Sequence, residues 1–261
     1  MLSYPSDVSD FQWFLLRKFF KKPPLGRPPI HSKQRIMSAI FYVLRSGCQW
    51  NMLPKDFPPY RTVYDYFMRW KKSGLWVFLN SKINSMARKV LKRKSSPSLA
   101  IIDSQSVKGF QGKQKEKGID GFKKVNGRKR HLLVDTQGLI LACFITPANV
   151  HDSQACIETT KEAFKHQNLE RLEVILADKG YRGKNERNIP DIFDVDLKIC
   201  SADKNDAFEV RPKRWIVERT NAWLSASRRT GKDYEVTPSS SVAWAYVANI
   251  RLGLRKIKKH K

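Results

Sequence analysis

The chain has 261 residues, 41% of them hydrophobic, which is enough for one large domain or two smaller ones with a core. Its 50 Lys and Arg against 24 Asp and Glu give a net charge of +26, which points to a polyanionic partner such as nucleic acid. The charge alone fits a ribosomal or membrane-surface protein equally well. No apolar stretch is long enough to cross a bilayer, no secretory signal is visible, and four scattered cysteines argue against a structural zinc.

Residues 1–98 predict helices. Apolar side chains recur at helical spacing in four segments, 7–22, 31–46, 61–72 and 75–91. Ser32 is suited to cap the second helix and Gly47 to end it. The basic, proline-rich segment 22–29 holds Gly26-Arg27-Pro28, which could lie in a DNA minor groove or could serve only as a stiff spacer.

The third predicted helix has a basic outward face. Residues 1–98 contain 19 Lys and Arg against 4 acids, and the outward cations of this helix are Arg61, Arg69, Lys71 and Lys72. Short helices with a basic face indicate a helix-turn-helix-type module that binds DNA, although a bundle that only dimerises has the same periodicity. We place a domain boundary in the Pro/Ser segment 95–98, so that domains of 1–98 and 99–261 are expected.

Strand patterns begin at Leu99. The stretch 99–105 begins with a short apolar run and predicts a strand buried on both faces with Asp103 at its C-terminal end. The run 174–177, in a strand expected over 172–177, repeats this pattern before Asp178. Two such strands could place both carboxylates on one rim of a sheet. The remaining predictions are a mobile loop at 109–127, a hairpin of strands 130–134 and 139–146, a helix at 151–167, a strand at 195–200, and helices at 214–229 and 241–258.

The helix 214–229 carries a third acid. Arg214, Glu218, Asn221 and Ser225 share one of its faces, and an ion pair of Glu218 with Arg214 is the simplest interpretation of that stripe. Together with Asp103 and Asp178, however, Glu218 would form an all-oxygen site suited to Mg²⁺ or Mn²⁺. Paired divalent ions promote in-line displacement at phosphodiesters, and the flanking phosphates could be bound by Lys179, Arg182, Arg214 and Arg219.

Five ordered motifs resemble those of one protein family. They are Asp-Ser-Gln-Ser-Val-Lys at 103–108, Gly-Arg-Lys-Arg-His at 127–131, Thr-Pro-Ala-Asn-Val-His-Asp-Ser at 146–153, Ala-Asp-Lys-Gly-Tyr-Arg at 177–182 and Arg-Trp-Ile-Val-Glu-Arg at 214–219. The series resembles bacterial DDE transposases, most closely insertion sequence family five within the wider family-four group. The wider group's signature is incomplete, because Arg211 stands at its Tyr and Ser225 at its later Lys.

The resemblance implies an α/β, RNase H-like catalytic core with a mixed sheet, preceded by the all-α module. It implies that Asp103, Asp178 and Glu218 are catalytic and bind Mg²⁺, with Mn²⁺ as a substitute. The implied activity is Mg²⁺-dependent hydrolysis at terminal inverted repeats of double-stranded DNA, followed by transfer of the 3′-hydroxyl ends to target DNA. At least a homodimer, acting in the bacterial cytoplasm, is expected.

Two other functions fit the same residues. A non-catalytic relic or repressor would bind DNA without cutting it, and a metal-dependent nuclease would cut without joining. His151 and Asp152 match a family motif, but a histidine at a strand-to-helix junction is expected to cap or to bond within the core. Asp135 is expected to shape its hairpin turn.

Overall fold

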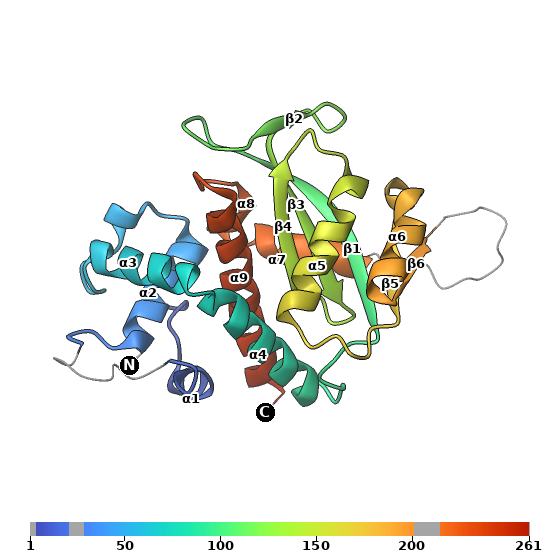
Figure 1. Cartoon of the computed structure of the whole chain (residues 1–261). Helices are drawn as coiled ribbons and strands as arrows, with labels where there is room; N and C mark the ends of the chain where they lie inside the picture. Colours follow the sequence, from blue (N-terminus) through green and yellow to red (C-terminus); the bar gives the residue numbers. More distant parts are fainter. Residues whose placement is uncertain (1–3, 21–28, 201–214, 261) are drawn as a thin grey trace.

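One mixed sheet, with helices on both of its faces, is joined to a helical N-terminal region (Figure 1). The computed structural model describes residues 4–20, 29–200 and 215–260. The described part contains no helix that is both long and apolar enough to cross a membrane. Cys48, Cys143 and Cys156 are free thiols.

The N-terminal helices begin and end where local signals place them. They are α1 (Asp10–Arg17), α2 (Lys33–Ser46), α3 (Tyr60–Lys72) and α4 (Leu75–Val90), with a short 3₁₀ turn at Trp50–Met52. Ser32 caps α2 as predicted, and Gly47 ends it with φ at 69°. The first helix begins later than predicted because Ser9 and Gln12 form a capping box that starts it at Asp10, and it ends at Arg17.

The sheet confirms the mixed topology. Its strands are β1 (Leu99–Lys108), β2 (Gly118–Asp120), β3 (Val125–Asp135), β4 (Ile140–Pro147), β5 (Val174–Ala177) and β6 (Asp196–Ile199). The core order is β4-β3-β1-β5-β6, and the short β2 pairs with the far end of β3. β1 runs antiparallel to β3 but parallel to β5. The strands β3 and β4 therefore lie on one side of β1, and the strands β5 and β6 lie on the other.

The later helices differ from the prediction in two places. They are α5 (Cys156–His166), α6 (Lys184–Phe193), α7 (Trp215–Ser225), α8 (Arg228–Gly231) and α9 (Pro238–Lys259), with 3₁₀ turns at Asp152–Ala155 and Lys179–Tyr181. The sequence did not predict α6, which buries little beyond Ile189 and so lacks a strong apolar stripe. The single helix expected over 214–229 is split into α7 and α8. The Thr230 hydroxyl donates to the Leu224 carbonyl, in the last turn of α7, and this bond stabilises the turn between the two helices.

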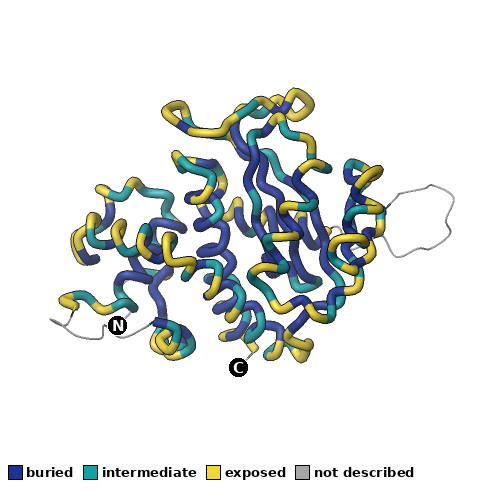
Figure 2. Tube along the Cα trace, in the orientation of Figure 1, coloured by how far each residue is buried: buried dark blue, intermediate teal, exposed yellow. Residues whose placement is uncertain are grey.

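Each face of the sheet has its own helices. α5 and α6 pack on one face, whereas α4, α7 and α9 pack on the other (Figure 1). The alternation of β1 follows this division, since Ile101 joins the core under α7 and α9 while Ile102 joins the core under α5. Figure 2 shows the strands buried along most of their length.

The first of these cores also includes the N-terminal helices. In Figure 1, α9 runs between the helices α1–α3 and the sheet. Trp244 of α9 stacks on Phe67 of α3 with 4.6 Å between ring centroids. Gly253 of α9 sits so close to α4 that an added Cβ would meet Ile83 at 2.5 Å. One continuous core therefore crosses the expected boundary at residue 98, and the division into two domains stays a prediction.

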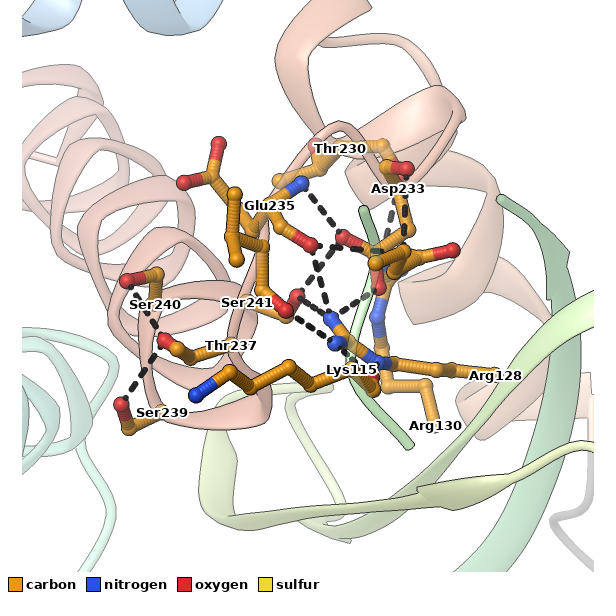
Figure 3. A network of polar contacts seen from close by, with 12 residues as sticks. Lys115, Arg128, Arg130, Thr230, Asp233, Glu235, Thr237, Ser239, Ser240 and Ser241 are labelled. Carbon is orange, nitrogen blue, oxygen red and sulfur yellow. Dashed lines mark hydrogen bonds and ion pairs between the residues drawn. The ribbon is translucent and has the colours of Figure 1, made fainter. Parts of the chain in front are cut away.

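The segment expected to be a mobile loop is held by a buried arginine (Figure 3). Arg128 of β3 donates to the carbonyl of Lys115 in that segment, at 3.0 Å from Nε, and to the carbonyl of Val236 at 2.7 Å. It also forms an ion pair with Asp233 at 3.1 Å and a hydrogen bond to Ser241 at 3.2 Å. Arg128, which has only 1% of its surface exposed, therefore links this segment to the start of α9, and the mobility of the segment stays a prediction.

Candidate active site

Of the three predicted acids, Asp103 lies on β1 and Asp178 directly follows the neighbouring strand β5. β1 and β5 are parallel, and Ile101 is opposite Leu176. Asp103 and Asp178 each follow two residues later, so alternation directs both side chains to the face covered by α7. The prediction that the first strand ends at Asp103 was wrong, because β1 continues to Lys108 in its pairing with β3.

Backbone hydrogen bonds orient both carboxylates. Asp103 Oδ1 accepts from the backbone N–H of Ser104 at 2.8 Å, and Asp178 Oδ1 accepts from that of Gly180 at 2.9 Å. The second bond belongs to the 3₁₀ turn that Asp178 caps, which explains why a carboxylate stands where β5 stops. Both acids are half-buried, and both are therefore accessible at the end of the sheet.

A buried tyrosine indicates that negative charge is concentrated here. Burial raises the pKa of Tyr181 well above its ordinary value, and the charges of Asp103, Asp152 and Asp178 raise that pKa further. Asp152 is balanced by Lys129, whose Nζ lies 2.8 Å from its Oδ1. Carboxylates gathered in this way favour the binding of a cation.

The third acid stands apart from this pair. α7 packs on β1 and β3, and its Ile216 and Val217 belong to the same core as Ile101. Glu218 is exposed on that helix, on the sheet face to which Asp103 points. Within residues 4–20, 29–200 and 215–260, no group of three or more His, Cys, Asp or Glu residues is close enough to hold a metal ion. Asn221, expected on the same polar stripe as Glu218, is buried.

The donor set nevertheless suits one kind of ion. Mg²⁺ is bound in proteins by one or two carboxylates, and water and substrate phosphate oxygens fill its remaining positions. Asp103 and Asp178 supply two such carboxylates at the edge of the sheet, and neither a thiol nor an imidazole is needed. The pair therefore fits a magnesium site that is completed by substrate.

The predicted DNA-binding side chains have different surroundings. Arg61, Arg69 and Lys72 are exposed on α3, and Lys179 and Arg182 are exposed beside Asp178. Lys71 is half-buried and donates to Ser240 of α9 at 3.0 Å, so it also joins two helices. Arg219 lies over Trp215 and Trp223, 4.5 Å from each ring centroid. Three arginines that the sequence singled out lie outside the described residues: Arg27, Arg211 and Arg214.

The motif residues expected to have structural roles do have them. Asp135 accepts from the N–H groups of Gln137 and Leu139, at 2.9 and 2.8 Å, and so shapes the hairpin turn. It also forms a buried ion pair with Arg88. His151 caps the turn that precedes α5, with its Nδ1 2.8 Å from the Ser153 hydroxyl.

Sequence reasoning missed a buried polar cluster behind Asp103. Lys129, His131, Thr146 and Asp152 lie on the α5 side of the sheet, and His131 Nε2 is 2.9 Å from Thr146 Oγ1. Lys129 also donates to the carbonyl of Val150 at 2.8 Å. A run of three basic residues in a strand that is otherwise apolar was the available signal, because such a run must find buried partners.

The histidine of this cluster predicts a pH-dependent stability. Burial lowers the pKa of His131 to about 4. At pH values below the ordinary histidine pKa, the unfolded chain binds a proton at His131 that the folded chain does not bind. The free energy of unfolding therefore falls as the pH drops from about 6.5 to 4, by ~3 kcal/mol in total. Urea unfolding at pH 7 and pH 5 should show ~2 kcal/mol less loss in His131→Gln than in the wild type. Equal losses would contradict this role.

Comparison with known proteins identifies the family. Residues 8–80 match the family described as "Putative transposase of IS4/5 family (DUF4096)", and residues 94–248, more than half of the chain, match "Transposase DDE domain". A relative from Burkholderia cepacia, "Putative transposase for insertion sequence element IS402", is 30% identical over 108 residues, which is 40% of this chain and 51% of the relative. The alignment thus spans about half the length of that curated relative.

Two solved structures are distantly similar. They are the Mos1 transposase paired-end complex with left transposon end, at 11% identity and a TM-score of 0.28, and the Mos1 strand transfer complex, at 12% and 0.26. Each alignment covers 96% of this chain, with 86% of the first structure and 84% of the second. Scores this low carry no argument about fold or function.

The family match agrees with the sheet. Asp103 lies on β1, and Asp178 follows β5, the fourth core strand along the chain when the short β2 is left out. The helix α7, which carries Glu218, covers the face of the sheet to which Asp103 points. These features, with the mixed strand order, are those of the RNase H-like core expected from the sequence. The chain belongs to the DDE transposase family of bacterial insertion sequences.

Proposed function

We propose that this protein binds the terminal inverted repeats of an insertion sequence, hydrolyses the phosphodiester bonds at its ends with Mg²⁺, and transfers the freed 3′-hydroxyl ends to target DNA. The observation that carries the proposal is the parallel register of β1 and β5, in which Ile101 lies opposite Leu176 and Asp103 and Asp178 each follow two residues later. Because the family is that of DDE transposases, this carboxylate pair is the natural location for its chemistry.

Each acid has a role in the proposal. Asp103 and Asp178 hold the divalent ions, Mg²⁺ or Mn²⁺, and Glu218 supplies a third carboxylate from α7. When bound, such ions activate the attacking hydroxyl and stabilise the leaving oxygen of an in-line displacement. Lys179 and Arg182, exposed next to Asp178, bind the phosphates that flank the scissile bond.

The distribution of exposed positive charge supports double-stranded DNA as the partner. The exposed cations of α3, Arg61, Arg69 and Lys72, bind the double-stranded end together with Arg27 and Arg214, and phosphate contacts of this kind dominate affinity. Transposition joins two ends of one element, so we expect at least two copies of the chain in the active complex.

A cleavage and joining assay tests the function. Full-length protein is incubated with labelled duplexes that carry the element's ends and with target DNA, in Mg²⁺ or in EDTA. We expect Mg²⁺-dependent cleavage at the ends and joined products in the target. Binding without cleavage would instead indicate a DNA-binding relic, and cleavage without joining of pre-cut ends would indicate a nuclease; either result overturns the proposal.

A further inference from the structure

A cavity of about 810 Å³ lies between the N-terminal region, α7 and α9. One cation from α2 and five from α9 line it: Arg45, Arg251, Arg255, Lys256, Lys258 and Lys259. We call this cavity the α9 groove. It is separate from the carboxylate pair, because neither Asp103 nor Asp178 lines it.

The α9 groove holds almost no negative charge. Among the described residues that line it, Asp7 is the single acid, and its carboxylate is already paired with Arg35 of α2 at 3.3 Å. Arg45 donates from Nη1 to the carbonyl of Ala226 at 2.8 Å, a bond that fixes its guanidinium at the groove without neutralising it. The groove is therefore a concave surface of one sign, which concentrates an anionic ligand.

Its cations repel one another. Burial and the charges of Arg45 and Arg255 lower the pKa of Arg251 to about 10. Burial, followed by the charge of Arg219, lowers the pKa of Lys256; the charge of Asp135 partly opposes this shift, and Lys259 adds to it. Like charges held together in a partly buried space disfavour their own ionised forms, and a bound anion relieves that cost.

Stabilisation of the helix terminus does not explain the cluster. Lys256, Lys258 and Lys259 lie in the last turn of α9, where cations interact favourably with the helix dipole. Arg251, however, lies two turns before the end of α9, and Arg45 belongs to α2. These two arginines contribute to the groove without serving the end of α9.

α7 links the α9 groove to Glu218, the third acid of the proposed active site. Thr220, Trp223 and Leu224 of α7 line the groove, and Glu218 lies five residues before Trp223, about 7.5 Å along the helix. Cations accompany this path, because Arg219 stacks on Trp223 and Lys256 lies over the same ring with Nζ 4.9 Å from its centroid. A DNA backbone that runs from Glu218 along α7 to the α9 groove would therefore lie next to positively charged side chains over its whole length.

We propose that the α9 groove binds the sugar–phosphate backbone of the duplex DNA that extends away from the scissile bond. This inference rests on the proposed function, because it takes DNA as the ligand. It adds a second contact, built by α2, α7 and α9, to the one that α3 supplies. Phosphates would occupy the groove without base readout, since cations on flexible side chains position the backbone but do not specify sequence.

Salt-dependent binding tests the groove in the full chain. Fluorescence anisotropy with a labelled duplex is measured from 50 to 200 mM NaCl for the wild type and for Arg251→Gln/Arg255→Gln. Each lost phosphate contact lowers the slope of log K against log salt by ~0.9, so the double variant should lose about 2 in slope. The exposed single variant Arg255→Gln, which leaves Arg251 in place, should lose about 1.

A matched control removes the same charge elsewhere. Lys165→Gln/Arg187→Gln takes one exposed cation from each of α5 and α6, on the opposite face of the sheet, and should keep the wild-type slope. Arg251→Lys/Arg255→Lys retains both charges and should also keep most of the slope. Circular dichroism confirms that each variant is folded.

The outcomes separate this proposal from the function on which it rests. If Arg255→Gln and the double variant, both folded, keep the wild-type slope while the wild type cleaves DNA, the α9 groove is overturned and the transposase function stands. If the groove variants lose slope but the wild type cleaves no DNA in Mg²⁺, the groove is supported and the catalytic proposal fails.

Discussion

Replacing Asp103 with Asn should reduce cleavage of the element's ends by at least ~10³-fold while leaving the affinity for those ends within about twofold. The substitution keeps the shape of the side chain but removes one of the charges that hold the metal ions. Metal catalysis of this kind is worth several kcal/mol in the transition state, and each 1.36 kcal/mol is tenfold in rate. Single-turnover cleavage in Mg²⁺ and anisotropy with the uncut duplex measure the two quantities.

A neighbouring carboxylate provides the control for this prediction. Asp196→Asn makes the same chemical change at an exposed position of β6 and should cleave at the wild-type rate. Asp178→Asn should behave as Asp103→Asn does, because the two acids share one site. Cleavage by Asp103→Asn at the wild-type rate would contradict the catalytic role proposed for Asp103.

Replacing Arg128 with Met should lower the free energy of unfolding by about 3–5 kcal/mol, because it breaks a buried pair from one side. The side chain of Asp233 is only 4% exposed, and it would keep its charge without its ion-pair partner. The carbonyls of Lys115 and Val236 would lose their donor as well. Urea denaturation monitored by tryptophan fluorescence measures the change.

An exposed ion pair supplies the comparison for Arg128. Lys161→Met breaks the pair with Glu158 on α5, where both side chains are about half exposed, and should cost less than about 1 kcal/mol. Arg128→Met/Asp233→Asn, which removes the uncompensated charge, should recover part of the loss. A loss below about 1 kcal/mol in Arg128→Met would show that the loop and the start of α9 do not depend on this arginine.

The fold was predictable where local signals were strong. Apolar periodicity located α2, α3 and α4, and Ser32 and Gly47 marked the ends of α2. The strand predicted over 172–177 ends at Ala177 as expected, where the polar Asp178 follows the apolar run, but it begins two residues later, at Val174. The ordered motifs of the sequence by themselves indicate the DDE family, and the order of the strands agrees with it.

What the sequence did not predict comes from long-range contacts. Nothing in the composition of residues 109–127 reveals their contact with Arg128, which is itself held by Asp233 and Ser241, more than a hundred residues further along the chain. The end of the strand at Asp103 was misjudged because β1 is prolonged by its pairing with β3, which sequence periodicity does not record. Lys129 and His131 were overlooked because charged and titratable residues in a strand are usually exposed.

The candidate site divides in the same way. The register of β1 and β5 is parallel, and Asp103 and Asp178 each follow the pair Ile101–Leu176 by two residues, as expected for two buried strands that each lead into an Asp. The position of Glu218 depends on how α7 packs on the sheet, which its helical spacing alone does not determine. Its participation in a shared site stays a proposal.

Binding of Mn²⁺ tests the joint role of the three acids most directly. Electron paramagnetic resonance measures free Mn²⁺ during titration of the full-length protein bound to a duplex end. The wild type and Asp196→Asn should bind the ion equally, Asp103→Asn and Asp178→Asn should lose most of that binding, and Glu218→Gln should weaken it. Binding of Mn²⁺ by all three acid variants as tightly as by the wild type would contradict the metal site on which the proposed chemistry depends.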